Sequence, residues 1–438
     1  AWVYAFTFIG GLFADKIFGF RKSLFWGGIL MIVGSVILAI NPKEFFFLGV
    51  SFTIVGTGFF KPNISSMVGM LYKEGDQRTD AGFSLFYAGV NLGAILGGYF
   101  CIAIGKRELF ATHIQEGLEW NVAFGLASIV MIISLLTFTQ TQKSLGEIGL
   151  SPLMHLEKKK RFLYEIGTYI GSIVIIPIII VMVSNTKYTD YFMYTIGPVS
   201  LLYLIYEMKG FSIQENKKLI AAVIFMLFSI VFWAFFEQSG GSLSDFAAEN
   251  LNKMVLGIEL DPNGVNNSAN SVFVVAFAAL VGMVWIWMAK KKIEPNTVVK
   301  FGLGFLFLAG GFWVFYYTKF FAGPDGKTSL DLFTLGWFVI TFGELCLSPI
   351  GMSAMTKLSP QKTQAVIMGM WFLASAYGQY FAGLLGAGIA EASKNSTNLQ
   401  KLNTYADGYQ QLALYALIAG VVLIVISPLV RKLMQDVK

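Results

Sequence analysis

The stretch GGLFADKIFGFRK, residues 10–22, decides the fold. It is a short segment of glycines, one acid and basic residues between two apolar runs. Glycines let helix ends approach closely and let the chain reverse. Asp15 can cap the amino end of a neighbouring helix or pair with a cation. The stretch therefore predicts a tight loop between two membrane spans, and Asp15 and Arg21 are candidate gating residues.

The composition places this loop in a membrane protein. The 438 residues are 55% hydrophobic and only 13% charged, and the mean hydropathy is +0.65. Soluble proteins carry about 25% charged residues, so most of this surface does not face water. Apolar runs of about 20 residues recur along the chain and do not alternate in polarity, which favours spanning helices over a barrel. The net charge of +6 fits basic cytoplasmic loops and does not call for nucleic acid.

The apolar runs predict the number of spans. Residues 1–14 are apolar but too short to cross a bilayer, so we expect the chain to start inside a helix, with one helix missing before it. Twelve further runs follow, and each is predicted to be a helix: 22–40, 45–72, 80–105, 120–141, 161–183, 190–208, 217–247, 268–289, 296–318, 330–356, 361–390 and 409–430.

The loops predict orientation and domains. If the loop at 10–22 is cytoplasmic, the loops on that side hold more than twice as many Lys and Arg residues as the others. This bias follows the positive-inside rule and puts both termini in the cytoplasm. Polar connections then divide the chain into an amino-terminal bundle (1–141), a linker with an inserted helix pair (142–210) and a carboxy-terminal six-helix bundle (211–438).

A lysine lies inside one predicted span. The segment GTGFFKPN, residues 56–63, places Lys61 about halfway along the run 45–72, more than two turns from either interface. A charge at that depth is costly, and it is functional unless the side chain reaches an interface. The glycines and Pro62 can loosen the helix beside it, so Pro62 is a candidate gating residue.

A second motif follows in the next span and leads to a family. In FSLFYAGVNLGAI, residues 83–95, Asn91 is a polar group that needs partners, either a ligand or another helix. Together with the two stretches above, this motif resembles the signatures of the proton-dependent oligopeptide transporter (POT) family of the major facilitator superfamily. The segments FWAFFEQ (232–238), ELCLSPIG (344–351) and GMWF (369–372) are similar to further motifs of that family.

The resemblance implies a fold and a function. The fold is an all-α integral membrane protein of the major facilitator type, with two six-helix bundles and an inserted helix pair. The function is a proton-coupled symporter in the bacterial inner membrane that imports di- and tripeptides by alternating access. We expect a multi-pass monomer in the lipid bilayer that needs protons but no metal or other cofactor, binds no nucleic acid and is not an enzyme.

The resemblance also implies site residues. Lys61 would hold the peptide carboxylate and Glu344 the free amino end, so that a short zwitterion links the two bundles. Glu237 would be the proton-coupling group, which pairs with Lys61 when ionised and releases it when protonated. Pro349 joins the gating candidates. The remaining pocket residues implied are Tyr4, Tyr87, Asn91, Asn270, Ser348 and Trp371.

Rival functions remain open. The family's first-helix carboxylate motif would precede the start of this sequence, and its loss would favour a relative that carries an anion or a peptide-like metabolite. A proton-coupled drug antiporter of the same superfamily is a second alternative, although the peptide-family motifs argue against it. An enzyme or a channel fits poorly, because the sequence has no metal-ligand cluster, nucleophile elbow, phosphate loop or sign of a symmetric filter.

Overall fold

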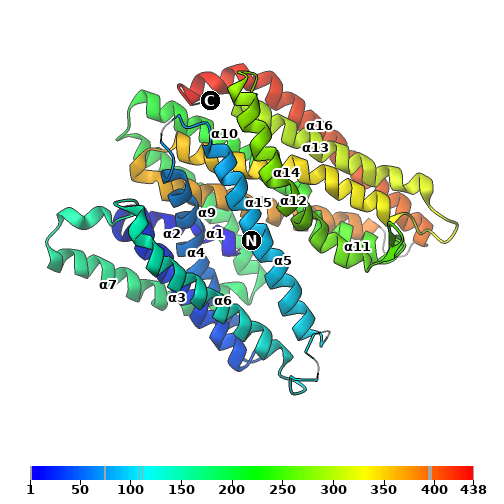
Figure 1. The fold of residues 1–438 in the computed structure, drawn as a ribbon, viewed down its shortest axis with the longest axis horizontal. Coiled ribbons are helices and arrows are strands. Elements are labelled where there is room, and N and C mark those ends of the chain that lie inside the picture. Colours follow the sequence, from blue (N-terminus) through cyan, green and yellow to red (C-terminus); the bar gives the residue numbers. More distant parts are fainter. Residues whose placement is uncertain (1, 74, 108, 111, 393–396, 438) are drawn as a thin grey trace. The chain divides into compact units, whose positions relative to one another are not determined.

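The protein is almost entirely helical. The computed structural model describes residues 2–73, 75–107, 109–110, 112–392 and 397–437 (Figure 1). Within these residues, nine helical segments are long and apolar enough to cross a membrane. The one short sheet in the described part pairs β1 (Met254–Val255) with β2 (Ile258–Glu259) as an antiparallel hairpin. The predicted all-α membrane fold is confirmed.

The helices follow one another along the chain with short connections. In chain order they are α1 (Trp2–Ala5), α2 (Thr7–Phe13), the π-helix η1 (Ala14–Phe18), α3 (Gly19–Ile40), α4 (Phe46–Met70), α5 (Thr79–Gly105), α6 (Glu119–Thr141), η2 (Gln142–Leu145), η3 (Pro152–His155), α7 (Lys158–Val174), α8 (Ile176–Val183), α9 (Thr186–Met208), α10 (Ile213–Phe236), η4 (Glu237–Gly240), α11 (Ser242–Asn250), α12 (Pro262–Lys290), α13 (Thr297–Tyr317), η5 (Thr318–Phe321), α14 (Leu330–Leu358), η6 (Gln361–Thr363), α15 (Gln364–Ala392) and α16 (Asn398–Met434).

The twelve predicted runs all fall on helices, but two of them are interrupted. The run 161–183 changes from α7 to α8 at Ile175, because Pro177 has no N–H to donate to the preceding turn. The run 217–247 breaks after α10, and a 3₁₀ turn of Glu237–Gly240 separates it from α11. This second break matters for function, since it falls on the predicted proton-coupling residue.

Two compact units divide the chain. The first comprises Ala1–Glu74, Leu96–Asn216 and Met355–Ala376, and the second comprises Gly75–Ile95, Lys217–Ala354 and Tyr377–Lys438. Each unit therefore includes a segment from the opposite half of the sequence. The domain boundaries given above follow sequence order instead of contacts, and they stay a prediction.

The first unit is built around α3, which packs along α4 and α6 (Figure 1). Its core joins Phe18 and Phe59 to Ile176 and Ile179, so the inserted helix pair shares the apolar core. The sequence predicts a tight loop at 10–22, but the structure makes this stretch helical, as the end of α2, η1 and the start of α3. Its Lys16 pairs with Glu207 on α9 at 2.8 Å. The insertion is thus packed onto the first unit by both apolar and ionic contacts.

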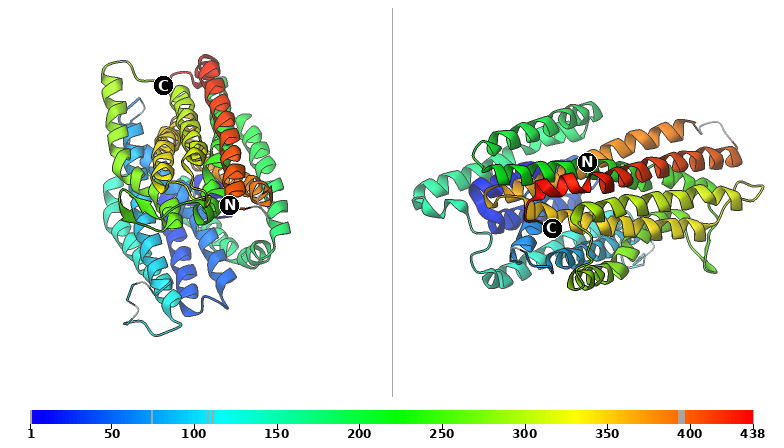
Figure 2. Two further views of the ribbon diagram at one scale, coloured as in Figure 1. Left: turned by 90° about the vertical axis from the view of Figure 1, so that its right-hand side faces the viewer. Right: turned by 90° about the horizontal axis from the view of Figure 1, so that it is seen from above.

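The second unit is built around α13 and α16, which run side by side in both views of Figure 2. Gly302 and Gly420 lie at this contact, where a Cβ on Gly420 would be 3.0 Å from the Gly302 carbonyl oxygen. Phe246 on α11 packs against Tyr409 with ring centroids 5.6 Å apart. Small residues and edge-to-face rings let these helices pack closely.

Candidate substrate, coupling and gating sites

Lys61 projects from α4 onto aromatic rings. Its Nζ lies 3.4 Å from the centroid of the Tyr4 ring and 4.9 Å from that of Phe372. Among the described residues of the first unit, no carboxylate is within ion-pairing distance of this ammonium group. An aromatic face attracts a cation but leaves its N–H donors unused. The arrangement therefore leaves the ammonium group of Lys61 beside aromatic rings, and its substrate-binding role stays a prediction.

Close backbone contacts hold Tyr4 over this lysine. The Thr7 hydroxyl donates to the Gly369 carbonyl oxygen at 3.0 Å, which ties the start of the chain to α15. A Cβ on Gly369 would lie 2.5 Å from the Thr7 carbonyl oxygen, so only glycine permits this approach. Trp371 follows two residues later and is buried in the same unit. The structure thus brings Tyr4 and Lys61 together and places Trp371 in the α15 segment that packs on α2.

Glu344 occupies a polar site in the second unit. Its side chain on α14 is 3% exposed, and both carboxylate oxygens accept hydrogen bonds. The Tyr87 hydroxyl on α5 donates to Oε1, and Asn270 Nδ2 on α12 donates to Oε2 at 2.6 Å. Asn270 also donates to Thr341 Oγ1 at 3.2 Å. Three helices therefore fix one buried carboxylate, and three of the sequence-predicted site residues lie in contact.

Ser348 and Asn91 are two further predicted site residues of the second unit, and their hydrogen bonding differs. Ser348 lies one helical turn after Glu344, so the two side chains share a face of α14. Its hydroxyl oxygen is buried and has no hydrogen-bond partner in the described part of the chain. Buried polar groups are normally satisfied, so this hydroxyl is suited to a ligand or a water molecule. Asn91 donates to the Tyr87 carbonyl oxygen at 3.1 Å, a bond within its own helix.

Glu237 is placed where a helix ends. It is the first residue of η4, directly after α10, and its Oε1 accepts a hydrogen bond from Gln379 Nε2 at 3.2 Å. Gln379 belongs to α15 in the second unit. The expected pairing with Lys61 joins residues of different units and stays a prediction.

Asp15 caps a helix, the first of the two possibilities expected for it. Its carboxylate accepts from the backbone N–H groups of Ala365, at 3.1 Å, and Val366, at 2.7 Å, in the first turn of α15. A negative charge at a helix amino end is stabilised by the unpaired N–H groups and by the helix dipole. The contact lies within the first unit, yet it joins residues about 350 positions apart in sequence. The gating role of Asp15 stays a prediction.

The other gating candidates differ in their surroundings. Arg21 donates from Nε to the Ile148 carbonyl oxygen at 2.6 Å and from Nη2 to that of Gly146 at 2.5 Å. It therefore fixes the linker against the first turn of α3. Pro62 and Pro349 are buried inside α4 and α14, and both helices continue through them.

Sequence reasoning missed a buried ionic cluster in the second unit. Lys300 lies near the start of the predicted helix 296–318, in the first turn of α13, and is 2% exposed. Its Nζ pairs with Asp80 at 2.8 Å and with Glu294 at 2.5 Å. Ser353 on α14 donates to the second Asp80 oxygen at 2.5 Å. The signal that could have marked this lysine is a charge between apolar neighbours, Val299 and Phe301, within a predicted helix.

Comparisons with known proteins agree with this architecture. A sequence signature described as the POT family matches residues 21–404. The chain is 32% identical to Peptide transporter YePEPT of Yersinia enterocolitica, over 98% of this chain and 83% of that protein. It is 29% identical to a di-/tripeptide transporter of Lactococcus lactis subsp. cremoris, over 100% of this chain and 86% of that protein.

Solved structures show the same likeness. A mutant of peptide transporter POT in complex with alafosfalin superposes with a TM-score of 0.71 at 30% identity, over 99% of this chain and 85% of that one. Fold and comparisons together define a polytopic membrane transporter of the major facilitator type. Within that class, the chain belongs to the POT family.

Proposed function

We propose that this chain is a proton-coupled symporter that imports di- and tripeptides by alternating access. One observation carries the proposal: Lys61 is a cation within the helix α4, beside two aromatic rings and with no acidic partner in the described part of its unit. An anion-binding group at that depth fits a substrate with a free carboxylate. Relatives named as peptide and di-/tripeptide transporters support the same substrate class.

The two polar centres suit the two ends of a peptide. Lys61 offers its ammonium group to the carboxylate end, with Tyr4 as its aromatic support. Glu344 offers a carboxylate to the free amino group, held in orientation by Tyr87 and Asn270. Ser348 adds a hydroxyl with no partner in the described residues, which can bond a backbone group of the substrate. A free amino acid has both charges on one carbon, so it fits such a site less well than a dipeptide.

Glu237 supplies the coupling in this scheme. When ionised it competes with substrate for Lys61, and when protonated it leaves that lysine to the peptide carboxylate. One proton that moves inward across −100 mV releases about 2.3 kcal/mol. A pH difference of one unit adds about 1.4 kcal/mol. Together these energies support accumulation of up to roughly a few hundred-fold for each proton.

The scheme also requires a membrane and an orientation. The spans make the chain a multi-pass membrane protein. The basic bias of the loops supports a bacterial inner membrane with both termini in the cytoplasm. We take the functional unit to be the monomer, since both polar centres lie on one chain.

The test is uptake of radiolabelled di-alanine by proteoliposomes under an inward proton gradient. The proposal expects accumulation above the equilibrium level, and an uncoupler should abolish it. Di- and tripeptides should compete with the label, whereas free alanine should not. Equal accumulation with and without the gradient would contradict proton coupling.

A second candidate substrate has one specific observation in its favour. A POT family transporter in complex with 5-aminolevulinic acid superposes with a TM-score of 0.70 at 27% identity. That molecule has an amino and a carboxylate end separated by a short chain, as a dipeptide has. If radiolabelled 5-aminolevulinic acid accumulates under the same gradient and radiolabelled di-alanine does not, the substrate is the metabolite.

A further inference from the structure

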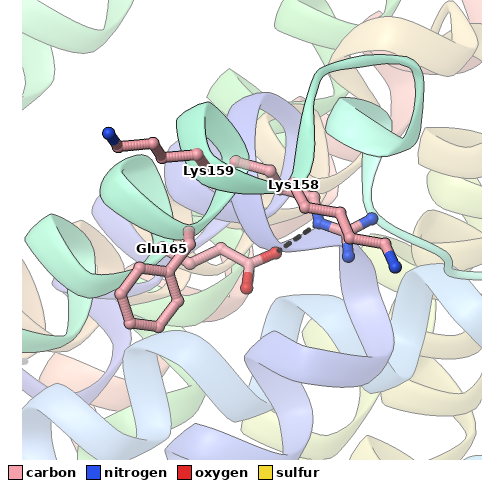
Figure 3. Close-up of a pocket in the computed structure, with 5 residues that line it drawn as sticks. Lys158, Lys159 and Glu165 are labelled. Atoms are coloured by element: carbon pink, nitrogen blue, oxygen red, sulfur yellow. Dashed lines mark ion pairs between the residues drawn. The ribbon is translucent and has the colours of Figure 1, made fainter.

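The amino end of α7 presents an exposed basic surface that the transport scheme does not use. Lys158, Lys159, Arg161, Phe162 and Glu165 line a solvent-open pocket there of about 420 Å³. The labelled lysines of Figure 3, Lys158 and Lys159, leave the helix in different directions, while Glu165 turns toward an ion-pair partner. We call this surface, residues 158–162 with Glu165, the basic rim.

Charge is not balanced within the basic rim. Glu165 is engaged by two cations: Lys22 Nζ lies 2.6 Å from its Oε1, and Arg161 Nε lies 3.7 Å from the same atom. The three lysines 158–160 are exposed, and no carboxylate of the described residues lies within ion-pairing distance of them. The basic rim therefore carries a net positive charge that the described protein does not neutralise.

The helix beyond this rim faces hydrocarbon on one side. Thr168 and Ser172 are buried against the unit, and the Trp26 indole donates to the Ser172 hydroxyl at 3.0 Å. The opposite face is apolar and open: Phe162 is 59% exposed, Ile170 56% and Val174 64%. A span with such a face must be covered by lipid chains. The lysines directly before Phe162 consequently lie at the level of lipid headgroups.

We propose that the basic rim binds the headgroup of an anionic phospholipid. Lysines 158–160 meet its phosphate, and the acyl chains lie along the exposed face that begins at Phe162. Clusters of basic residues next to a membrane span attract acidic lipids, and aromatic side chains at that level anchor the interface. Glu165 is the one carboxylate that lines the pocket, and its ion pairs with Lys22 and Arg161 neutralise its charge. It therefore does not repel the phosphate.

The test is native mass spectrometry of the purified chain with phosphatidylglycerol or phosphatidylcholine added at matched concentrations. Wild type should retain phosphatidylglycerol in preference to phosphatidylcholine. The triple variant Lys158→Gln, Lys159→Gln, Lys160→Gln should lose this preference by about tenfold or more, since each lysine near an anionic surface changes binding by about five-fold. Photo-reactive phosphatidylglycerol should label residues 158–174 in wild type and not in the variant.

A matched triple variant on the predicted opposite side controls for net charge. Lys43→Gln, Lys187→Gln and Lys253→Gln remove the same charge from exposed positions and should leave the preference unchanged. Excess inorganic phosphate should not displace the lipid, because it lacks the chains that contact the apolar face. Equal loss in both triple variants, or full retention in the 158–160 variant, would overturn the proposal. Uptake of di-alanine by the same variants reports separately on transport, so failure of one proposal leaves the other standing.

Discussion

At the scale of single residues, three ionisable side chains within the helices have different kinds of neighbours. Lys61 lies against aromatic rings, Glu344 between hydrogen-bond donors, and Lys300 between two carboxylates. The sequence could predict the first two, because a charge within an apolar run stands out. It could not predict the partners of the third, because Asp80 is 220 positions away from Lys300.

Removal of the Lys61 charge should abolish uphill uptake. Lys61→Met keeps the length of the side chain and its contact with the Tyr4 ring but cannot bind a carboxylate. A charged hydrogen bond contributes about 1.5–3 kcal/mol, so peptide affinity should fall by about tenfold or more. The measurement is binding and proton-driven uptake of di-alanine, with the exposed Lys43→Met as control. A variant that transports normally for each folded molecule would exclude Lys61 from the site.

Substitution of Glu237 should impair proton coupling, whereas substitution of Glu344 should impair peptide binding. Glu237→Gln imitates the protonated carboxyl, so proton-driven accumulation should disappear while exchange of labelled for unlabelled peptide survives at least in part. Glu344→Gln should weaken both modes, because a peptide ammonium loses its charge partner. Both modes are measured for both variants in the same liposomes. Full proton-driven uptake by Glu237→Gln would place the coupling on another group.

At the scale of helices, one carboxylate at the amino end of α15 ties distant parts of the first unit together. Asp15→Ala should destabilise the folded state by about 0.5–2 kcal/mol, the usual effect of a lost cap. Asp15→Asn should cost less, since the amide oxygen still accepts one backbone hydrogen bond. Thermal unfolding in detergent measures the difference, and the exposed Glu259→Ala is the control. Identical unfolding temperatures for Asp15→Ala and wild type would show that the cap adds no stability.

The buried cluster should behave as a coupled set. Lys300→Met leaves two carboxylates without their cation and should cost about 3–5 kcal/mol. Asp80→Asn in the same chain should restore part of this loss, because it removes the more buried of the two charges. A double-mutant cycle of unfolding free energies measures the coupling. Strict additivity would mean that the ion pair contributes nothing of its own.

The sequence predicted whole helices better than their interruptions. Runs of apolar residues mark where helices lie, and the pair Gly240-Gly241 and the turn glycine Gly257 were the local signals for the break in the run 217–247 and for the β1–β2 hairpin. The hairpin is local, with a two-residue turn of Leu256 and Gly257 between its strands. The resemblance to the POT family implied Tyr87 and Asn270 as site residues, while their contact with Glu344 required the fold.

At the scale of the whole molecule, the chain combines a major facilitator fold with two polar centres of opposite charge, one in each unit. A symporter of this kind links the movement of substrate to the movement of protons. Uptake should therefore rise as the external pH falls below the internal pH, and it should rise further with an inside-negative potential. A transporter that only equilibrates its substrate would respond to neither force.

The most direct test records lumenal pH in liposomes that contain the purified chain and a trapped pH-sensitive dye. At symmetric starting pH, with an inside-negative potential and di-alanine added outside, the lumen should acidify. It should not acidify with free alanine, or in liposomes that contain Lys61→Met. Uptake of labelled di-alanine without any lumenal pH change would contradict the account, because peptide would then cross the membrane without its proton.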